Sequence, residues 1–76
     1  MKELVAFIAA ALVDDQAAIQ VAEEERDNIL VLELRVAKED LGKVIGKQGR
    51  TAKAIRSVLG AAASRDNRKV RLDILE

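Results

Sequence analysis

The stretch KVIGKQGRTAKAIR, residues 43–56, holds two glycines three residues apart between two apolar patterns of helical spacing. Before the glycines, Leu41, Val44 and Ile45 are spaced to share one face of a short helix. The first glycine stands where a C-cap glycine ends such a helix. The segment GKQG, residues 46–49, therefore predicts a sharp turn between two helices.

A second helix is predicted to begin at Arg50. Its apolar residues recur at steps of three or four, which predicts an inner face made of Ala52, Ile55, Leu59 and Ala62. Another face of the same helix carries cations at steps of three: Arg50, Lys53 and Arg56. Such a helix packs its apolar face on a core and leaves its cations in solvent.

The short helix before the loop is predicted over residues 37–46. The rest of the chain predicts one more helix and three strands. Apolar residues at helical spacing predict an amphipathic helix over residues 2–13, with an inner face of Leu4, Ile8, Ala11 and Leu12. Alternating apolar residues predict strands at residues 17–22, 30–36 and 70–74. The polar run EEERDN separates the first two strands and favours a hairpin.

The predicted order of elements is helix, strand, strand, helix, helix, strand. Because the apolar faces of the strands cannot remain in water, the strands should form one sheet covered by the three helices. The fold class is therefore a two-layer α+β domain. With 76 residues the chain forms a single domain, residues 1–76, and buries only roughly 60% of its unfolded surface.

The composition excludes several classes of site. The chain has no Cys and no His, which removes disulfides, thiolate and imidazole metal ligands, and the commonest general base. Its hydroxyl side chains are few, and no carboxylate lies among residues 41–65, so we expect no enzyme, no metal and no cofactor. The apolar part of the N-terminus is about half as long as a membrane helix, so we expect no membrane span.

The net charge of zero hides a separation of charge along the chain. Residues 1–40 carry 10 acidic and 4 basic side chains, whereas residues 41–65 carry 6 basic and no acidic side chains. This asymmetry indicates that the middle segment faces an anion. The acidic residues of the EEERDN run lack the spacing of a calcium loop, and we expect them at a hairpin tip away from the basic segment.

The GKQG loop has the features of an anion site. Gly46 and Gly49 let the backbone adopt positive φ and approach a ligand closely. Arg50 begins a helix whose N-terminal N–H groups and dipole favour an anion. A Walker loop is excluded because the glycine spacing is one residue short and glutamine follows the lysine. A dinucleotide fingerprint is excluded because the strand–turn–helix context and a third glycine are missing.

The segment VIGKQGRTAKAIR resembles the signature of the KH domain, in which an Ile-Gly-x-x-Gly segment joins two helices and clamps about four unpaired nucleotides. The element order resembles the bacterial type II KH arrangement, with an extra helix and strand before the motif. The resemblance covers essentially the whole chain, and the length matches the small single-domain bacterial KH proteins of the KhpA family.

This resemblance implies a cytoplasmic protein that binds single-stranded RNA and forms a homodimer or a heterodimer with a larger KH-containing protein. Loop N–H groups would contact phosphate oxygens, and Lys47 and Arg50 would add charge. Leu41, Val44 or Ile45 would form an apolar floor for the bases, and which of them faces the groove stays open. The implied RNA-binding residues are Lys43, Val44, Ile45, Gly46, Lys47, Gln48, Gly49, Arg50, Lys53 and Arg56.

Two alternatives remain open at this point. The chain could be a protein-interaction or dimerisation module that uses the GxxG helices as its interface, which is compatible with RNA binding. It could also bind single-stranded DNA, because nothing in the sequence must contact a 2′-hydroxyl. The chain has no Tyr and no Trp, so it lacks the usual aromatic stacking platform, and one site alone should bind with modest affinity.

Overall fold

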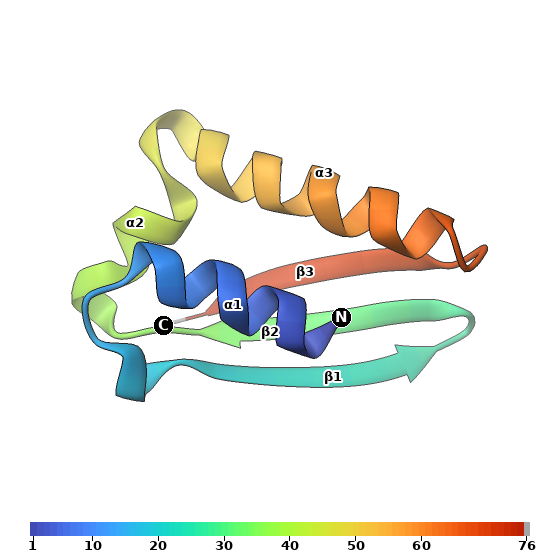
Figure 1. Cartoon of the computed structure of the whole chain (residues 1–76), viewed down its shortest axis with the longest axis horizontal. Coiled ribbons are helices and arrows are strands. Elements are labelled where there is room, and N and C mark those ends of the chain that lie inside the picture. Colours follow the sequence, from blue (N-terminus) through green and yellow to red (C-terminus); the bar gives the residue numbers. More distant parts are fainter. Residues whose placement is uncertain (76) are drawn as a thin grey trace.

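Residues 1–75 are described by the structure, a computed structural model with a two-layer α+β fold (Figure 1). The helices and strands, in chain order, are α1 (Lys2–Leu12), β1 (Gln20–Arg26), β2 (Ile29–Arg35), α2 (Leu41–Ile45), α3 (Arg50–Ser64) and β3 (Lys69–Leu75). Three short turns of 3-10 helix lie between them: η1 (Gln16–Ala18), η2 (Lys38–Asp40) and η3 (Lys47–Gly49). No helix in residues 1–75 is both long and apolar enough to cross a membrane.

The three strands form one sheet in the order β1-β2-β3, so β2 is central and the other two strands are edges. β1 and β2 pair antiparallel through a two-residue turn at Asp27 and Asn28, which both have positive φ as such hairpin turns require. β2 and β3 pair parallel. A parallel pair needs a crossover connection, and the α2–α3 segment supplies it.

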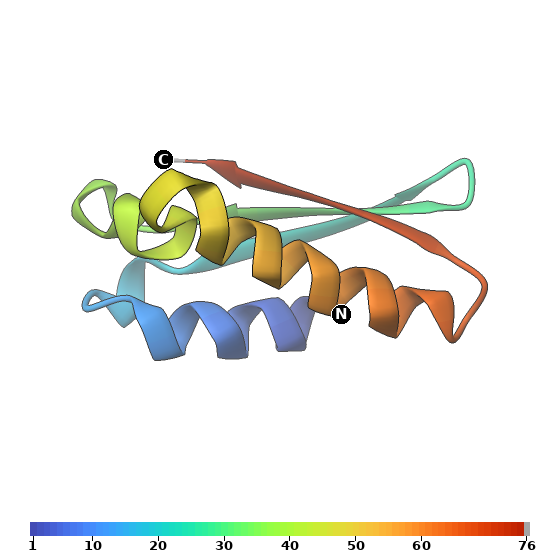
Figure 2. The ribbon, with the colours of Figure 1, turned by 90° about the horizontal axis from the view of Figure 1, so that it is seen from above.

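All helices lie on one face of the sheet (Figure 2). Alternate residues of β2 point into this layer, and the register places Leu32 opposite Leu72 of β3. The buried apolar side chains come from every helix and from the sheet: Val5, Ala9, Leu30, Leu32, Leu34, Val44, Ile55, Leu59 and Leu72. The predicted fold class and element order are confirmed.

The first strand begins later than predicted. The alternation of apolar residues from Ala17 to Val21 favoured a strand, but this segment starts as the turn η1, and β1 begins at Gln20. The chain must turn here from the end of α1 to the edge of the sheet. The side-chain amide of Gln16 supports this turn by donating to the carbonyl of Ala10 (3.1 Å). β1 also runs on to Arg26, so most of the run EEERDN belongs to the strand and only Asp27 and Asn28 form the turn. The helix predicted over residues 37–46 is shorter, because its first part is the turn η2 and α2 begins at Leu41. The remaining predicted boundaries lie within one residue of the observed ones.

Two helix faces differ from the prediction. In α1 the buried residues are Val5 and Ala9, and Ala11 is exposed. Apolar residues surround most of α1, so spacing alone did not select the buried face. The other residues of the predicted α1 face pack half-buried beside the core: Leu4, Ile8 and Leu12. In α3 the last buried residue is Ala63, which lies four residues after Leu59 on the same face of the helix. The predicted Ala62 is only half-buried.

Candidate nucleic-acid interface

The GKQG loop has an unusual backbone. Gly46 (φ 77°), Gln48 (φ 58°) and Gly49 (φ 73°) all have positive φ. The N–H of Gly46 donates to the carbonyl of Gly42 (2.8 Å), and the N–H of Gly49 donates to the carbonyl of Gly46 (3.1 Å). The loop is therefore a tight turn that exposes Lys47 and Gln48 at its tip.

The loop leads directly into the N-terminus of α3. The N-cap residue is Gly49, and no side chain in residues 1–75 caps this end by a hydrogen bond. The first N–H groups of a helix have no partner within the helix, and the helix dipole adds partial positive charge there. This end of a 15-residue helix therefore favours an anion.

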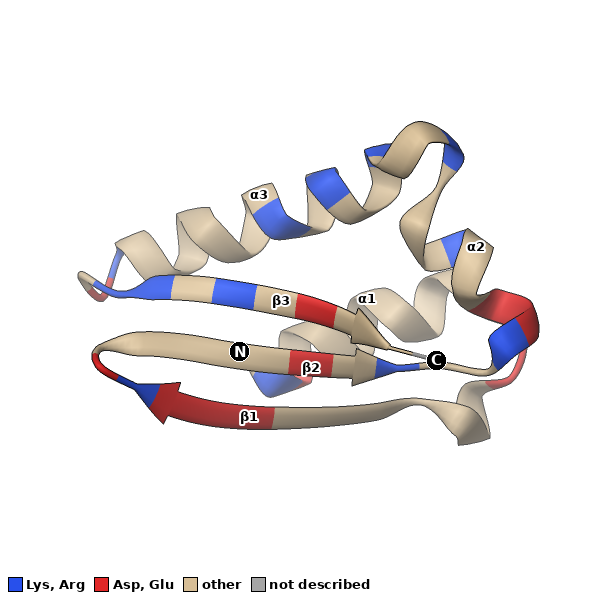
Figure 3. Ribbon diagram, turned by 180° about the vertical axis from the view of Figure 1, so that it is seen from behind, with Lys and Arg blue, Asp and Glu red and all other residues tan. Residues whose placement is uncertain are grey.

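The cations around the loop are exposed. Arg50 donates to the side-chain oxygen of Gln48 (3.1 Å). Within residues 1–75, no ion pair joins Lys47, Arg50 or Lys53 to a carboxylate. Figure 3 shows basic positions along α3, whereas the acidic half of β1 lies at the far edge of the sheet. The acidic run of β1 and the basic positions of α3 are thus also separated in space.

Comparison with known families fits this geometry. A family model described as "KhpA/KhpB, KH domain" matches residues 2–74. The chain belongs to this KH-domain family.

Curated relatives named "RNA-binding protein KhpA" match the chain over nearly its full length. The protein from Halalkalibacterium halodurans is 55% identical over 76 residues, which is 100% of each chain. The protein from Clostridium acetobutylicum is 52% identical over 75 residues, 99% of this chain and 100% of the relative. The protein from Chlamydia trachomatis is 51% identical over 76 residues, 100% of this chain and 97% of the relative. No solved structure matches the chain.

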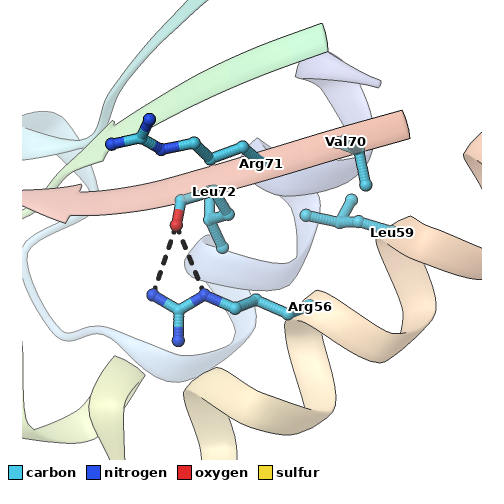
Figure 4. Close-up of a pocket in the computed structure, with 5 residues that line it drawn as sticks. All are labelled: Arg56, Leu59, Val70, Arg71 and Leu72. Carbon is cyan, nitrogen blue, oxygen red and sulfur yellow. Dashed lines mark hydrogen bonds between the residues drawn. The ribbon is translucent and has the colours of Figure 1, made fainter. Parts of the chain in front are cut away.

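In this KH domain a small cavity lies between α3 and β3, on the side where α3 carries Arg56 (Figure 4). Its volume is about 220 Å³, and it is lined by Arg56, Leu59, Val70, Arg71 and Leu72. The guanidinium of Arg56 donates through Nε and Nη2 to the carbonyl oxygen of Leu72, at 3.3 and 3.2 Å. The cavity therefore combines apolar side chains with a guanidinium and a backbone acceptor.

The three apolar candidates of the KH motif have different surroundings. Val44 is 0% exposed and belongs to the core, and Leu41 packs half-buried against the core. Ile45 is 37% exposed and directly precedes the loop. Of these three side chains, Ile45 is the one that a ligand can reach most easily, and Val44 contributes by holding α2 on the core.

Lys43 differs from the other predicted site cations because it lies between two carboxylates. Its Nζ forms an ion pair with Asp14 and a second one with Asp40 (3.2 Å). Both carboxylates raise the pKa of Lys43, and Asp14 has the larger effect. The charge of Lys43 is thus balanced within the fold.

Sequence reasoning missed Asp40 and Leu72 as parts of this region. Asp40 precedes Lys43 by three residues, a spacing that brings opposite charges together on a helix and could have indicated the pair. Leu72 was recognised only as a strand residue. Its contribution is a backbone carbonyl, and the sequence carries no signal for that.

Proposed function

We propose that this protein binds single-stranded RNA and holds the sugar–phosphate backbone at the GKQG loop. The observation that carries the proposal is the junction of the loop with α3, where a backbone of positive φ leads into an uncapped helix N-terminus. Relatives named RNA-binding protein KhpA support it. KH domains use such loops to clamp about four nucleotides.

The phosphates lie against backbone N–H groups of the loop and of the first turn of α3 other than those of Gly46, Gly49 and Arg50, which donate to carbonyls of preceding residues. Lys47 and Arg50 add charge at this point, and Lys53 extends the positive field one turn further along α3. These contacts fix the position and direction of the strand, but they carry no sequence information.

The bases lie over Ile45 and toward the cavity between α3 and β3. Ile45 supplies an apolar contact. The guanidinium of Arg56, held in place by its two hydrogen bonds to the carbonyl of Leu72, offers its remaining N–H groups to base edges. Phe7, the only aromatic residue, is on α1 and lines no part of this cavity. Without aromatic stacking each site binds weakly, so two linked sites are needed for tight binding.

Association with a second KH chain is a further candidate function. Phe7 on α1 is 74% exposed, and Val58 on α3 is 50% exposed. If a second chain covers the helical layer, these two apolar side chains are the ones it would take out of water. A homodimer, or a heterodimer with a larger KH-containing protein, would join two RNA sites. Sedimentation analysis that compares the molecular mass of the wild type with that of Val58→Lys tests this contact. A dimer would have to bury the new lysine, so the variant should shift to the monomer.

Fluorescence anisotropy of short labelled single-stranded RNAs, at two salt concentrations, tests RNA binding at the loop. The test variant combines Lys47→Asp and Gln48→Asp, which place two carboxylates at the expected phosphate positions. The control combines Lys2→Asp and Gln20→Asp, which change the charge equally at exposed positions on α1 and β1. Circular dichroism verifies that both variants are folded.

We expect salt-sensitive binding by the wild type and the control, and loss of binding in the loop variant. Equal loss in both variants would assign the effect to net charge and contradict the proposed site. The same titration with a labelled single-stranded DNA of matching sequence tests the alternative that the protein binds DNA. Equal affinity for RNA and DNA would make the protein a general binder of single strands.

A further inference from the structure

α2 has only five residues, too few to form a stable helix by itself, yet it carries the GKQG loop. On its inner side, Val44 anchors it in the core. At its start, a set of charged side chains anchors it to the loop between α1 and η1. We call Asp14, Asp40 and Lys43 the ion cluster.

Asp40 is at the centre of the ion cluster. It is 3% exposed and is the one buried polar or charged residue within residues 1–75. One carboxylate oxygen accepts the backbone N–H of Asp15 (2.9 Å), and the other pairs with Nζ of Lys43 (3.2 Å). Lys43 also pairs with Asp14. The residue before α2 and a residue within α2 are thus both tied to one short segment.

We propose that the ion cluster, with Asp40 as its positioning residue, sets the direction of α2 and so fixes where the GKQG loop presents its N–H groups to RNA. A buried carboxylate must keep its partners, since leaving it unpaired is strongly unfavourable, so Asp40 holds the backbone of Asp15 and the ammonium of Lys43 together. A loop fixed in advance binds more tightly because less order is lost on binding.

This inference gives Lys43 a role other than phosphate contact. Its charge is balanced by Asp14 and Asp40, whereas Lys47 and Arg50 have no carboxylate partner in the described chain. Lys43 therefore acts through α2. The RNA part of the inference rests on the proposed function, but the placement of the loop does not.

Asp40→Asn tests the inference, with Glu39→Gln as a matched control at an exposed neighbouring carboxylate. The first measurement is amide hydrogen exchange without RNA at Gly46 and Gly49, whose N–H groups are hydrogen-bonded. The reference amides are those of core residues in β2 and α3. The second measurement is the Kd for a labelled single-stranded RNA as a function of salt.

In Asp40→Asn we expect exchange at the two glycines to accelerate by about tenfold, with little change at the core amides. The Kd should rise about fivefold with an unchanged salt slope, because no phosphate contact is removed. Glu39→Gln should match the wild type in both measurements. Equal acceleration in the loop and in the core would overturn the inference, since Asp40 would then act only on global stability.

Lys43→Met removes the same bridge from its exposed end, and it decides the question if Asp40→Asn does not fold. It should accelerate exchange at the two glycines, and Lys43→Arg, which keeps the charge, should restore the wild-type rates. Wild-type exchange in Lys43→Met would overturn the inference. If the wild type binds no RNA, the proposed function fails, but the exchange measurements still decide whether the cluster positions the loop.

Discussion

Thr51 occupies the space in which Gly46 would carry a side chain. A Cβ placed on Gly46 would lie 2.7 Å from the Cβ of Thr51 and 2.9 Å from its backbone nitrogen. A Cβ on Gly49 would meet no atom within 4 Å. Both glycines have positive φ, but only Gly46 also brings the end of α2 against the first turn of α3. The two glycines are therefore needed for different physical reasons.

Gly46→Ala should destabilise the fold more than Gly49→Ala. Alanine at position 49 has only the positive φ to accommodate, at about 1–2 kcal/mol. Alanine at position 46 also overlaps Thr51, for a total of about 2–5 kcal/mol. Urea unfolding of both variants measures the difference, and equal losses of stability would contradict this assignment.

Lys47 and Lys43 should differ in the salt dependence of RNA binding. Lys47→Ala removes a phosphate contact. The negative slope of log K against log salt should therefore become less steep by about 0.7. Lys43→Ala should leave the slope unchanged, because the charge of Lys43 is already balanced by Asp14 and Asp40. Anisotropy titrations at several salt concentrations measure both slopes. The same decrease for both variants would show that Lys43 contacts phosphate.

Asp40 should contribute to acid unfolding. The backbone N–H of Asp15, with a smaller contribution from Lys43, holds the pKa of Asp40 below its ordinary value. Because the folded pKa is the lower one, the carboxylate stabilises the fold above about pH 4, and this stability is lost as the pH falls through the folded pKa. Asp40→Asn cannot titrate, so its free energy of unfolding should decline less steeply below pH 4. Urea unfolding across this range would contradict the prediction if the two profiles were parallel.

Gly60→Ala should stabilise the isolated chain. Gly60 lies inside α3, and a Cβ there would meet no atom within 4 Å. Alanine in a helix interior is more favourable than glycine by about 0.8–1.0 kcal/mol. Urea unfolding at low protein concentration should show this gain. A loss of stability that grows with protein concentration would instead indicate that Gly60 is packed tightly in a dimer.

Much of the loop could be predicted from the sequence. Glycine at positions 46 and 49 already indicated positive φ, and Gly46 does end α2. The positive φ of Gln48 could not be predicted, because a glutamine seldom adopts it and the turn imposes it. The parallel pairing of β2 and β3 was also absent from the pattern, since alternation predicts a strand but not its neighbour.

The contacts that the ion cluster makes with the segment after α1 lay beyond sequence reasoning for another reason. Asp15 lies 25 residues before its partner Asp40, and Asp14 lies 29 residues before Lys43. No periodic pattern connects segments so far apart. Lys43 was therefore grouped with the cations of its own segment. Only the packing of α2 beside the end of α1 shows that its charge is already balanced.

An NMR titration of the ¹⁵N-labelled protein with a short single-stranded RNA tests the central claim most directly. The largest shifts of amide signals should occur at residues 46–50, with smaller shifts at residues 70–72 beside the cavity, and β1 should remain unchanged. Largest shifts on β1 or on α1, with the amides of the GKQG loop unmoved, would contradict the claim that this loop holds the RNA backbone.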